Sequence, residues 1–181
     1  MAHSRKSHGF LFRLMQVLVA LLLLVGAGYG ALCLYGRDAV WEQIAGPADD
    51  GPYDFDAPKR TGWKNDWLIC PAGECAGGRP DEISAPFPVS ADRLFATVLQ
   101  DLKEDPHVTI TAVDETTHRL RAIARTELMH FPDRIHIRVD ASGESTSLLD
   151  AYSASQLGRG DFGVNRSRLE RLLAELRAQL S

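Results

Sequence analysis

The sequence RLRAIARTELMHFPDRIHIRVD, residues 119–140, contains two runs in which apolar and polar residues alternate. Alternate side chains of a strand point to opposite faces of a sheet, so each run predicts a strand with one buried face. The apolar positions are Leu120, Ala122, Ala124, Ile135, Ile137 and Val139. Strands joined by a short connection are usually antiparallel neighbours, and we therefore predict a pair of adjacent strands here.

Similar patterns continue on both sides of this pair. Residues 107–113 alternate in the same way, and residues 145–153 form a weaker fourth strand. A helix over residues 91–105 is predicted by five apolar side chains on one helical face, with Ser90 as its N-cap and Pro106 at its end. A second helix is predicted by leucines at helical spacing, namely Leu169, Leu172, Leu173, Leu176 and Leu180.

The order helix, four strands, helix predicts an α+β fold. We expect a four-stranded antiparallel meander with both helices on its apolar face. The opposite face would be open, or covered by part of the preceding segment. We assign residues 60–181 to this domain.

The segment before the domain is poor in apolar residues. Between Arg37 and Ile83, Leu, Ile, Val and Phe make up only 6 of 47 residues, and the acidic sequence DDGPYDFDAP lies at its middle. Such a composition buries little surface, so we predict an acidic, irregular tether over residues 37–59.

The N-terminal part contains one long apolar run. Residues 14–36 hold 18 hydrophobic residues in 23 positions, enough for a transmembrane helix, and a basic cytoplasmic N-terminus of residues 1–13 precedes it. Positive charge before the run and acidic residues after it predict a single-pass signal anchor in the inner membrane, with the C-terminal domain in the periplasm. A cleaved signal peptide, with a small-residue site at Val25-Gly26-Ala27, is the alternative.

Charge and cysteine content narrow the classes of protein. The formal net charge is −4, and residues 37–181 alone carry 17 basic and 24 acidic residues, which argues against nucleic acid as a partner. Cys70 and Cys75 have the spacing of a small loop-closing disulfide in an oxidising compartment. No metal-ligand spacing and no cofactor motif is recognisable, and we assign no catalytic residue.

Two polar clusters are candidates for ligand binding. Five arginines and His136 share the polar face of the predicted strands, which could bind an anion, or could be a solvated surface paired with nearby carboxylates. The second cluster surrounds three glycines before the last helix, where Asp161 or Asn165 could instead act as a helix cap. The candidate ligand-binding residues are Arg121, Arg125, Arg138, Arg159, Asp161, Asn165 and Arg168.

Three blocks of the sequence resemble a known family. NDWLICPAGEC, LRAIARTELMHFPDRIHIRV and YSASQLGRGDFGVNRSRLERLLAEL are similar, in this order, to the bacterial domain-of-unknown-function family DUF 1499. The resemblance covers roughly residues 60–180 and implies a shared fold with no agreed activity. Many members of that family likewise have an N-terminal membrane segment.

The family's recurrent polar positions correspond here to Arg125, Thr126, Asp133, Ser153, Ser155, Gly158, Asp161, Gly163, Asn165 and Arg168. One position departs from the family pattern, because Ala154 stands between the two serines where the family commonly has arginine. If that arginine contributes to an anion site in other members, the site in this chain is weaker or is filled from elsewhere, for example by Arg121.

Three functions remain open at this stage. The first is a membrane-anchored binding or scaffold module for an anionic ligand or an envelope partner. The second is an enzyme that acts on a cell-envelope component, with Asp161, Asn165, Arg125 and Asp133 meeting in a polar cleft. The third is a structural subunit of a membrane assembly. The sequence contains no recognisable hydrolase arrangement, so the binding module is our leading hypothesis and enzyme activity is left unassigned.

The anchor hypothesis predicts the behaviour of the chain in membranes. An uncleaved transmembrane helix keeps the protein in the membrane pellet after extraction with alkaline carbonate, which removes peripheral and soluble proteins. Release of the full-length chain into the supernatant would contradict the anchor.

Overall fold

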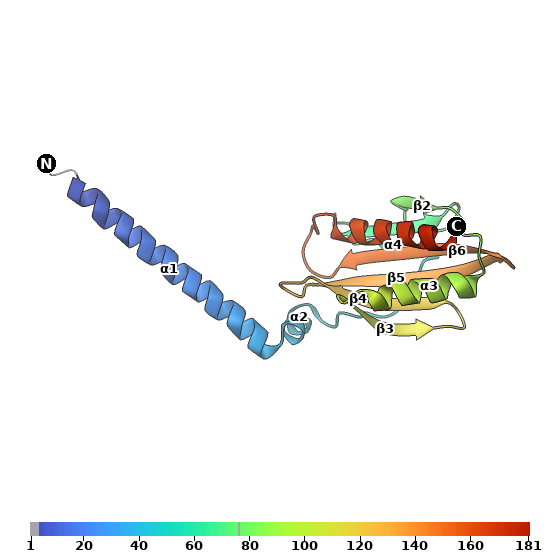
Figure 1. Ribbon diagram of the computed structural model, residues 1–181, viewed down its shortest axis with the longest axis horizontal. Helices are drawn as coiled ribbons and strands as arrows, with labels where there is room; N and C mark the ends of the chain where they lie inside the picture. The colour runs from blue at the N-terminus through green and yellow to red at the C-terminus, as the bar shows by residue number, and fades with distance from the viewer. Residues whose placement is uncertain (1–3, 76) are drawn as a thin grey trace. The chain divides into compact units, whose positions relative to one another are not determined.

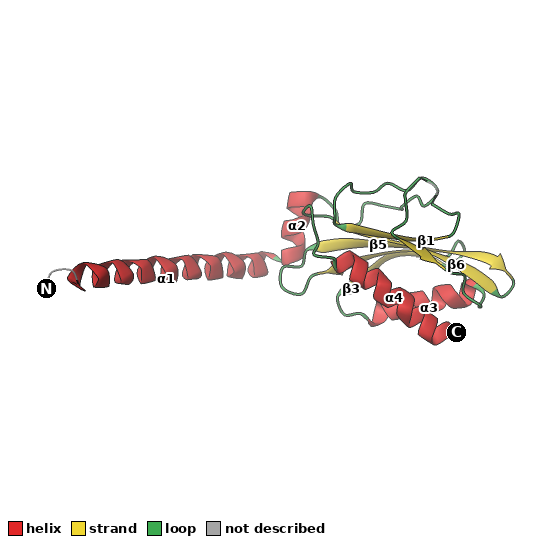
Figure 2. Cartoon of the chain, turned by 90° about the horizontal axis from the view of Figure 1, so that it is seen from above, coloured by secondary structure: helices red, strands yellow, loops and turns green. Residues whose placement is uncertain are grey.

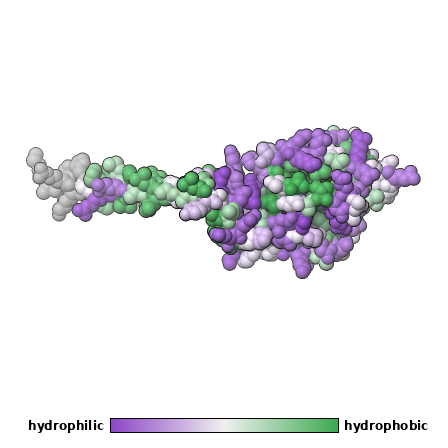
Figure 3. Space-filling model, turned by 90° about the horizontal axis from the view of Figure 1, so that it is seen from below, coloured by the Kyte–Doolittle hydropathy of each residue, from purple (hydrophilic) through white to green (hydrophobic). Residues whose placement is uncertain are grey.

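The computed structural model describes residues 4–75 and 77–181. The chain divides into two compact units, with the division between Val40 and Trp41. The first unit consists mainly of helix α1, Ser4–Tyr35. Its stretch Gly9–Tyr35 is long and apolar enough to cross a membrane, and its surface is apolar, whereas the surface of the second unit is mostly polar (Figure 3). An N-terminal signal sequence has a similar length and apolar composition.

The second unit is an α+β domain built on a single sheet (Figure 1). Its strand order is β2-β1-β6-β5-β4-β3. The strands are β1 Asp66–Pro71, β2 Glu82–Ser84, β3 Val108–Asp114, β4 Arg119–Arg125, β5 Pro132–Gly143 and β6 Thr146–Ser155. The helices are α2 Arg37–Ala45, which crosses the division between the units, α3 Ala91–Glu104 and α4 Val164–Leu180.

The prediction of a four-stranded antiparallel sheet was incomplete: the predicted strands β3 to β6 pair antiparallel in chain order, but they are part of a larger sheet. The sheet has six strands and is mixed, because β1 pairs antiparallel with β6 and parallel with β2. Both additional strands come from the apolar-poor part of the sequence. The last four residues of β1 are all buried, and β2 has only three residues, so neither shows the alternation by which strands are recognised in a sequence.

Helices α3 and α4 pack together on one face of the sheet (Figure 2). The apolar side chains that alternate along β4 and β5 face these helices and form the main core with them. Ser90 caps α3, since its hydroxyl oxygen accepts a hydrogen bond from the backbone N–H of Arg93. The five leucines that predicted the last helix are all buried in α4.

The opposite face of the sheet is covered by chain rather than open to solvent (Figure 2). We call residues 46–62 the covering segment. Phe55 of this segment packs with Leu68, Tyr152 and the two cysteines in a second, smaller core. The region predicted as an irregular tether therefore begins with helix α2 and continues as the covering segment, which is part of the compact domain.

The main core predicts the effect of a single truncation in α4. Leu176 is fully buried between α4 and the sheet, so Leu176→Ala should lower the free energy of unfolding by about 2–5 kcal/mol. Glu175→Ala, at the exposed neighbouring position, is the matched control and should change it by less than about 0.5 kcal/mol. Chemical denaturation followed by near-UV circular dichroism measures both, and equal effects would contradict this core.

Candidate functional site

Acidic residues of the covering segment pair with arginines of the sheet. The distance from Asp49 Oδ1 to Arg121 Nη1 is 3.2 Å, and that from Asp50 Oδ2 to Arg134 Nη1 is 2.7 Å. The backbone carbonyl of Ala48 also accepts a hydrogen bond from Arg134 Nε. The arginine face predicted from the sequence therefore exists, and it is occupied by carboxylates of the same chain.

Arg138 forms the most deeply buried of these pairs. Its side chain is only 4% exposed, and its Nε lies 2.8 Å from Oδ2 of Asp150, which is buried on the neighbouring strand β6. Asp56 of the covering segment accepts a second hydrogen bond, from Arg138 Nη1 at 2.6 Å. These contacts hold the pKa of Asp56 below its usual range, since the hydrogen bond and the positive charge of Arg138 stabilise the carboxylate.

A cavity of about 570 Å³ lies between the covering segment and strands β5 and β6, and we call it the sheet-face cavity. Tyr53 of the covering segment stacks on Tyr152 of β6 with ring centroids 4.2 Å apart. The imidazole of His136 lies 5.4 Å from the Tyr53 ring centroid. The lining residues are Asp50, Pro52, Tyr53, Asp54, Ala57, Lys59, Arg60, Thr61, Arg134, His136 and Tyr152.

His136 is a buried polar side chain of this cavity. It is 6% exposed, and among the described residues its Nδ1 atom has no hydrogen-bond partner. Burial lowers the pKa of His136 to about 4, against the opposing effect of Asp50, so the ring is neutral near pH 7. A buried polar atom without a partner is costly, and a ligand atom in the cavity could satisfy it.

The polar groups around the cavity differ in how many hydrogen bonds they already make to other residues of the chain. The Arg60 guanidinium bonds to Asp66 through Nε and Nη2 and reaches Asp81 at 2.7 Å. Tyr152 donates a hydrogen bond from its hydroxyl to Asp66, and burial raises the pKa of Tyr152 well above its usual range. Lys59 is exposed at the edge, so its ammonium group can approach an anion without leaving water completely.

The polar residues at the start of α4 form a closed hydrogen-bond network. The Asp161 carboxylate accepts hydrogen bonds from the backbone N–H groups of Gly163 and Asn165 and thereby caps α4. The fully buried Asn165 amide donates to the Asp161 carboxylate and to the Ser155 hydroxyl. Arg168 Nη2 lies 2.8 Å from Asp133 Oδ2 and so joins α4 to the start of β5.

This network bears on the enzyme hypothesis. Asp161 and Asn165 bond to each other and to the backbone at the start of α4, whereas Asp133 bonds to Ser155 and Arg168. Arg125 instead lines a separate cavity of about 370 Å³, together with Thr126, Gly163 and Arg168. The hydrogen bonds of the network cap α4 and join it to β5, which is a structural role for these side chains.

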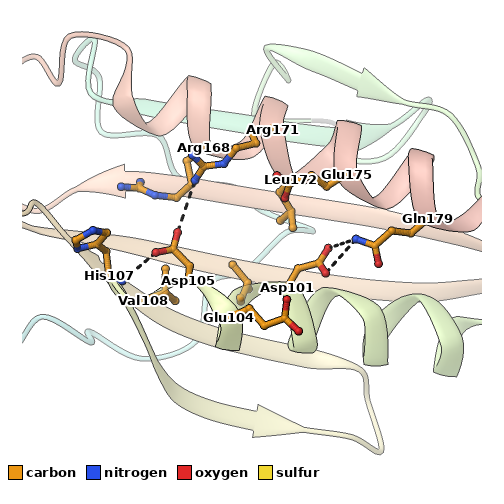
Figure 4. A pocket seen from close by; sticks show the side chains of 11 residues that line it. Asp101, Glu104, Asp105, His107, Val108, Arg168, Arg171, Leu172, Glu175 and Gln179 are labelled. Carbon is orange, nitrogen blue, oxygen red and sulfur yellow. Dashed lines mark hydrogen bonds and ion pairs between the residues drawn. The ribbon is translucent and has the colours of Figure 1, made fainter.

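A groove of about 510 Å³ separates α3 from α4 (Figure 4). Its polar side chains carry mixed charge and pair across it: Asp101 accepts hydrogen bonds from Gln179, and Asp105 lies 3.6 Å from Arg171. Asp105 also accepts a hydrogen bond from the backbone N–H of His107. The groove is thus bridged by internal contacts between the two helices.

Two of the cysteines form a disulfide, as the sequence predicted. Cys70 and Cys75 are bonded, and Sγ of Cys75 lies 3.3 Å from a carboxylate oxygen of Asp150. These three residues also form a cluster of potential metal ligands within the described part of the chain. The disulfide occupies both sulfurs, so they are not available as thiolate ligands.

Six of the seven candidate residues lie in two places. Arg121 and Arg138 lie under the covering segment, whereas Arg125, Asp161, Asn165 and Arg168 lie around the start of α4. Arg159 lies apart from both, with its guanidinium over the ring of Trp63. Sequence reasoning missed Tyr53, Tyr152 and the role of His136. The feature of the sequence that could have indicated this site is the acidic run 49–56, whose negative charge is complementary to the arginines of the sheet.

The fold and its covered arginine face define an α+β domain that follows an N-terminal apolar helix. The chain belongs to the family described as "Protein of unknown function (DUF1499)", whose model matches residues 52–176. The search of the curated proteins found no match. Among solved structures, the chain is similar to the di-domain ARO/CYC BexL from the BE-7585A biosynthetic pathway, with a TM-score of 0.35 and 10% identity. That similarity covers 53% of this chain and 42% of the BexL chain.

The buried imidazole predicts a loss of stability in mild acid. The unfolded chain binds a proton at His136 near pH 6.5, but the folded chain does so only near pH 4. The contribution of His136 is therefore complete above pH 6.5 and is lost as the pH falls from 6.5 to 4, on the order of 3 kcal/mol.

Urea unfolding at a series of pH values measures this loss. His136→Gln should flatten the dependence between pH 6.5 and 4, while His107→Gln, at an exposed histidine, should leave it unchanged. An identical pH dependence in wild type and His136→Gln would show that His136 does not titrate in this way.

Proposed function

We propose that the chain is a membrane-anchored binding module that takes a small anionic ligand into the sheet-face cavity. One observation carries the proposal: a cavity of about 570 Å³ is lined by a buried, neutral imidazole whose Nδ1 has no partner among the described residues. Volumes of about 300–1,000 Å³, with aromatic walls and a few polar groups, are typical of small-molecule sites.

The chemistry of the lining supports an anionic ligand of modest size. Tyr53 and Tyr152 provide a flat aromatic wall, and the His136 imidazole can donate or accept one hydrogen bond. Lys59 supplies an exposed cation at the edge, and Arg134 supplies a second cation that is shared with Asp50. An anion that displaces Asp50 from Arg134 would exchange one carboxylate for another at little electrostatic cost.

The covering segment is part of the proposed site. Arg121 and Arg138 do not line the cavity, but their pairs with Asp49 and Asp56 hold the segment that forms its outer wall. We therefore propose a supporting role for these two arginines. Arg125, Arg159, Asp161, Asn165 and Arg168 lie away from the cavity and are not needed for it.

The proposed location is the inner membrane, with the domain in the periplasm. The three basic residues Arg5, Lys6 and Arg13 precede the apolar stretch or lie at its start, and the segment after it is acidic, which is the charge pattern of an N-terminus that stays in the cytoplasm. The Cys70–Cys75 disulfide fits an oxidising compartment. An envelope component would then supply the ligand.

A thermal-shift series tests the site. The probes are inorganic phosphate, citrate, glucuronate and glycerol 3-phosphate, added to the full chain in detergent. A ligand present at ten times its Kd stabilises the folded domain by about 1.4 kcal/mol, which raises the Tm by a few degrees. We expect at least one probe to raise the Tm of the wild type.

His136→Phe should abolish that rise, because it fills part of the cavity and removes the imidazole nitrogens. His107→Phe makes the same change at an exposed histidine outside the cavity and should retain the rise. Each variant is compared with its own Tm in the absence of probe. A rise that persists in His136→Phe, or no rise with any probe, would contradict the proposed site.

A further inference from the structure

One end of the sheet gathers several loops. The cross-strand pairs Arg125↔Pro132, Asp133↔Ser155 and Asp66↔Ala154 place the end of β4, the start of β5, the end of β6 and the start of β1 at the same end of the domain. Residues 61–65, 126–131 and 156–163 extend from there, and we call them together the loop end. A bridge between Lys64 and Gly160 joins two of these loops.

The loop end exposes large apolar side chains, although most other large apolar side chains of the domain are buried. Phe162 is fully exposed and Leu128 is 65% exposed, each from a different loop. Trp63 and Phe131 are also exposed in part. Several exposed apolar side chains at one end of a domain indicate a contact surface rather than chance exposure.

The position of Phe162 is held by the backbone around it. Phe162 has φ of +55°, a conformation that costs a bulky L-residue of order 1–3 kcal/mol. Its neighbours are fixed, because the Asp161 N–H donates to the Lys64 carbonyl and the Asp161 carboxylate accepts from the Gly163 N–H. The α4 network therefore keeps the Phe162 ring pointing into solvent on a rigid turn.

Aromatic and cationic groups lie together at this end. The guanidinium carbon of Arg159 lies 4.4 Å from the centroid of the Trp63 ring, and Lys64 is the next, exposed residue. Tryptophan, phenylalanine and long basic side chains are the residues that favour the boundary between lipid headgroups and acyl chains.

The connection between the loop end and the apolar N-terminal stretch indicates that the partner of the loop end is a lipid surface. Trp41 packs against Phe131 with ring centroids 4.7 Å apart and donates a hydrogen bond from Nε1 to the Met129 carbonyl, so the chain enters the domain at the loop end. The apolar stretch that could span a membrane ends at Tyr35, six residues earlier. Six residues extend at most about 20 Å, which keeps this end within reach of any membrane that holds the stretch.

We propose that the loop end docks on the surface of that membrane, with Phe162 and Leu128 inserted among the lipid headgroups and Lys64 and Arg159 at the phosphate level. The docking does not depend on a ligand in the sheet-face cavity. It restrains the domain at the membrane and directs the opposite end of the sheet, with the turn between β5 and β6, away from the lipid.

Site-directed spin labelling of the full chain tests the docking. In a Cys33→Ser background, which leaves the Cys70–Cys75 disulfide intact, nitroxides are attached to Phe162→Cys, Leu128→Cys and Glu144→Cys. Glu144 is the matched control, because it is exposed in the β5–β6 turn about 30 Å along the sheet from the loop end. The protein is placed in nanodiscs of phosphatidylcholine and phosphatidylglycerol.

We expect collision with oxygen to exceed collision with a water-soluble nickel chelate at residue 162 or 128, and the reverse at residue 144. The oxygen-to-nickel ratio should be at least several times higher at the loop end than at the control. Ratios at both 162 and 128 equal to that at 144 would overturn the proposal. All three labelled positions are exposed, so the fold should be retained, and a melting curve of each labelled protein checks this.

Discussion

The ion pairs between the covering segment and the arginines of the sheet are the constraint on which the second face of this domain depends. Arg138 is almost completely buried, and a buried guanidinium is tolerated only when carboxylates surround it. Asp150 provides one from the sheet and Asp56 provides another from the covering segment. Removal of one partner from such a pair typically costs about 3–5 kcal/mol, so these contacts are central to holding the segment in place.

The covering segment creates features that neither sheet nor segment has alone. Its Phe55 completes the second core, next to the Cys70–Cys75 disulfide, and its Tyr53 stacks on Tyr152. The space left between these contacts is the sheet-face cavity, in which the buried His136 has no partner for Nδ1 within the described part of the chain. A surface that looked from the sequence like a row of exposed arginines is therefore covered by the same chain, and only Arg134 of that row lines the cavity.

The start of α4 has a different character. Asp161 and Asn165 lie in a glycine-rich context and Asp133 follows a proline, so read along the chain these acidic and amide side chains suggest chemistry. In the folded domain these side chains cap α4 and form hydrogen bonds or ion pairs with Ser155 and Arg168. Their positions stabilise the turn that carries Phe162, so this polar network supports the exposed apolar side chain beside it.

The sequence by itself determined the elements whose pattern is local: the apolar helix, the strands with alternating residues such as Ile135 and Ile137, the leucine face of α4 and the spacing of Cys70 and Cys75. Hydropathy period and short-range spacing carry that information. Only the tertiary structure decided that β1 and β2 extend the sheet and that acidic residues 49–56 lie on arginines 70 to 85 positions later. These contacts join distant parts of the chain. A short strand without alternation, or a carboxylate in an irregular segment, shows no periodic pattern in the sequence from which its partner could be predicted.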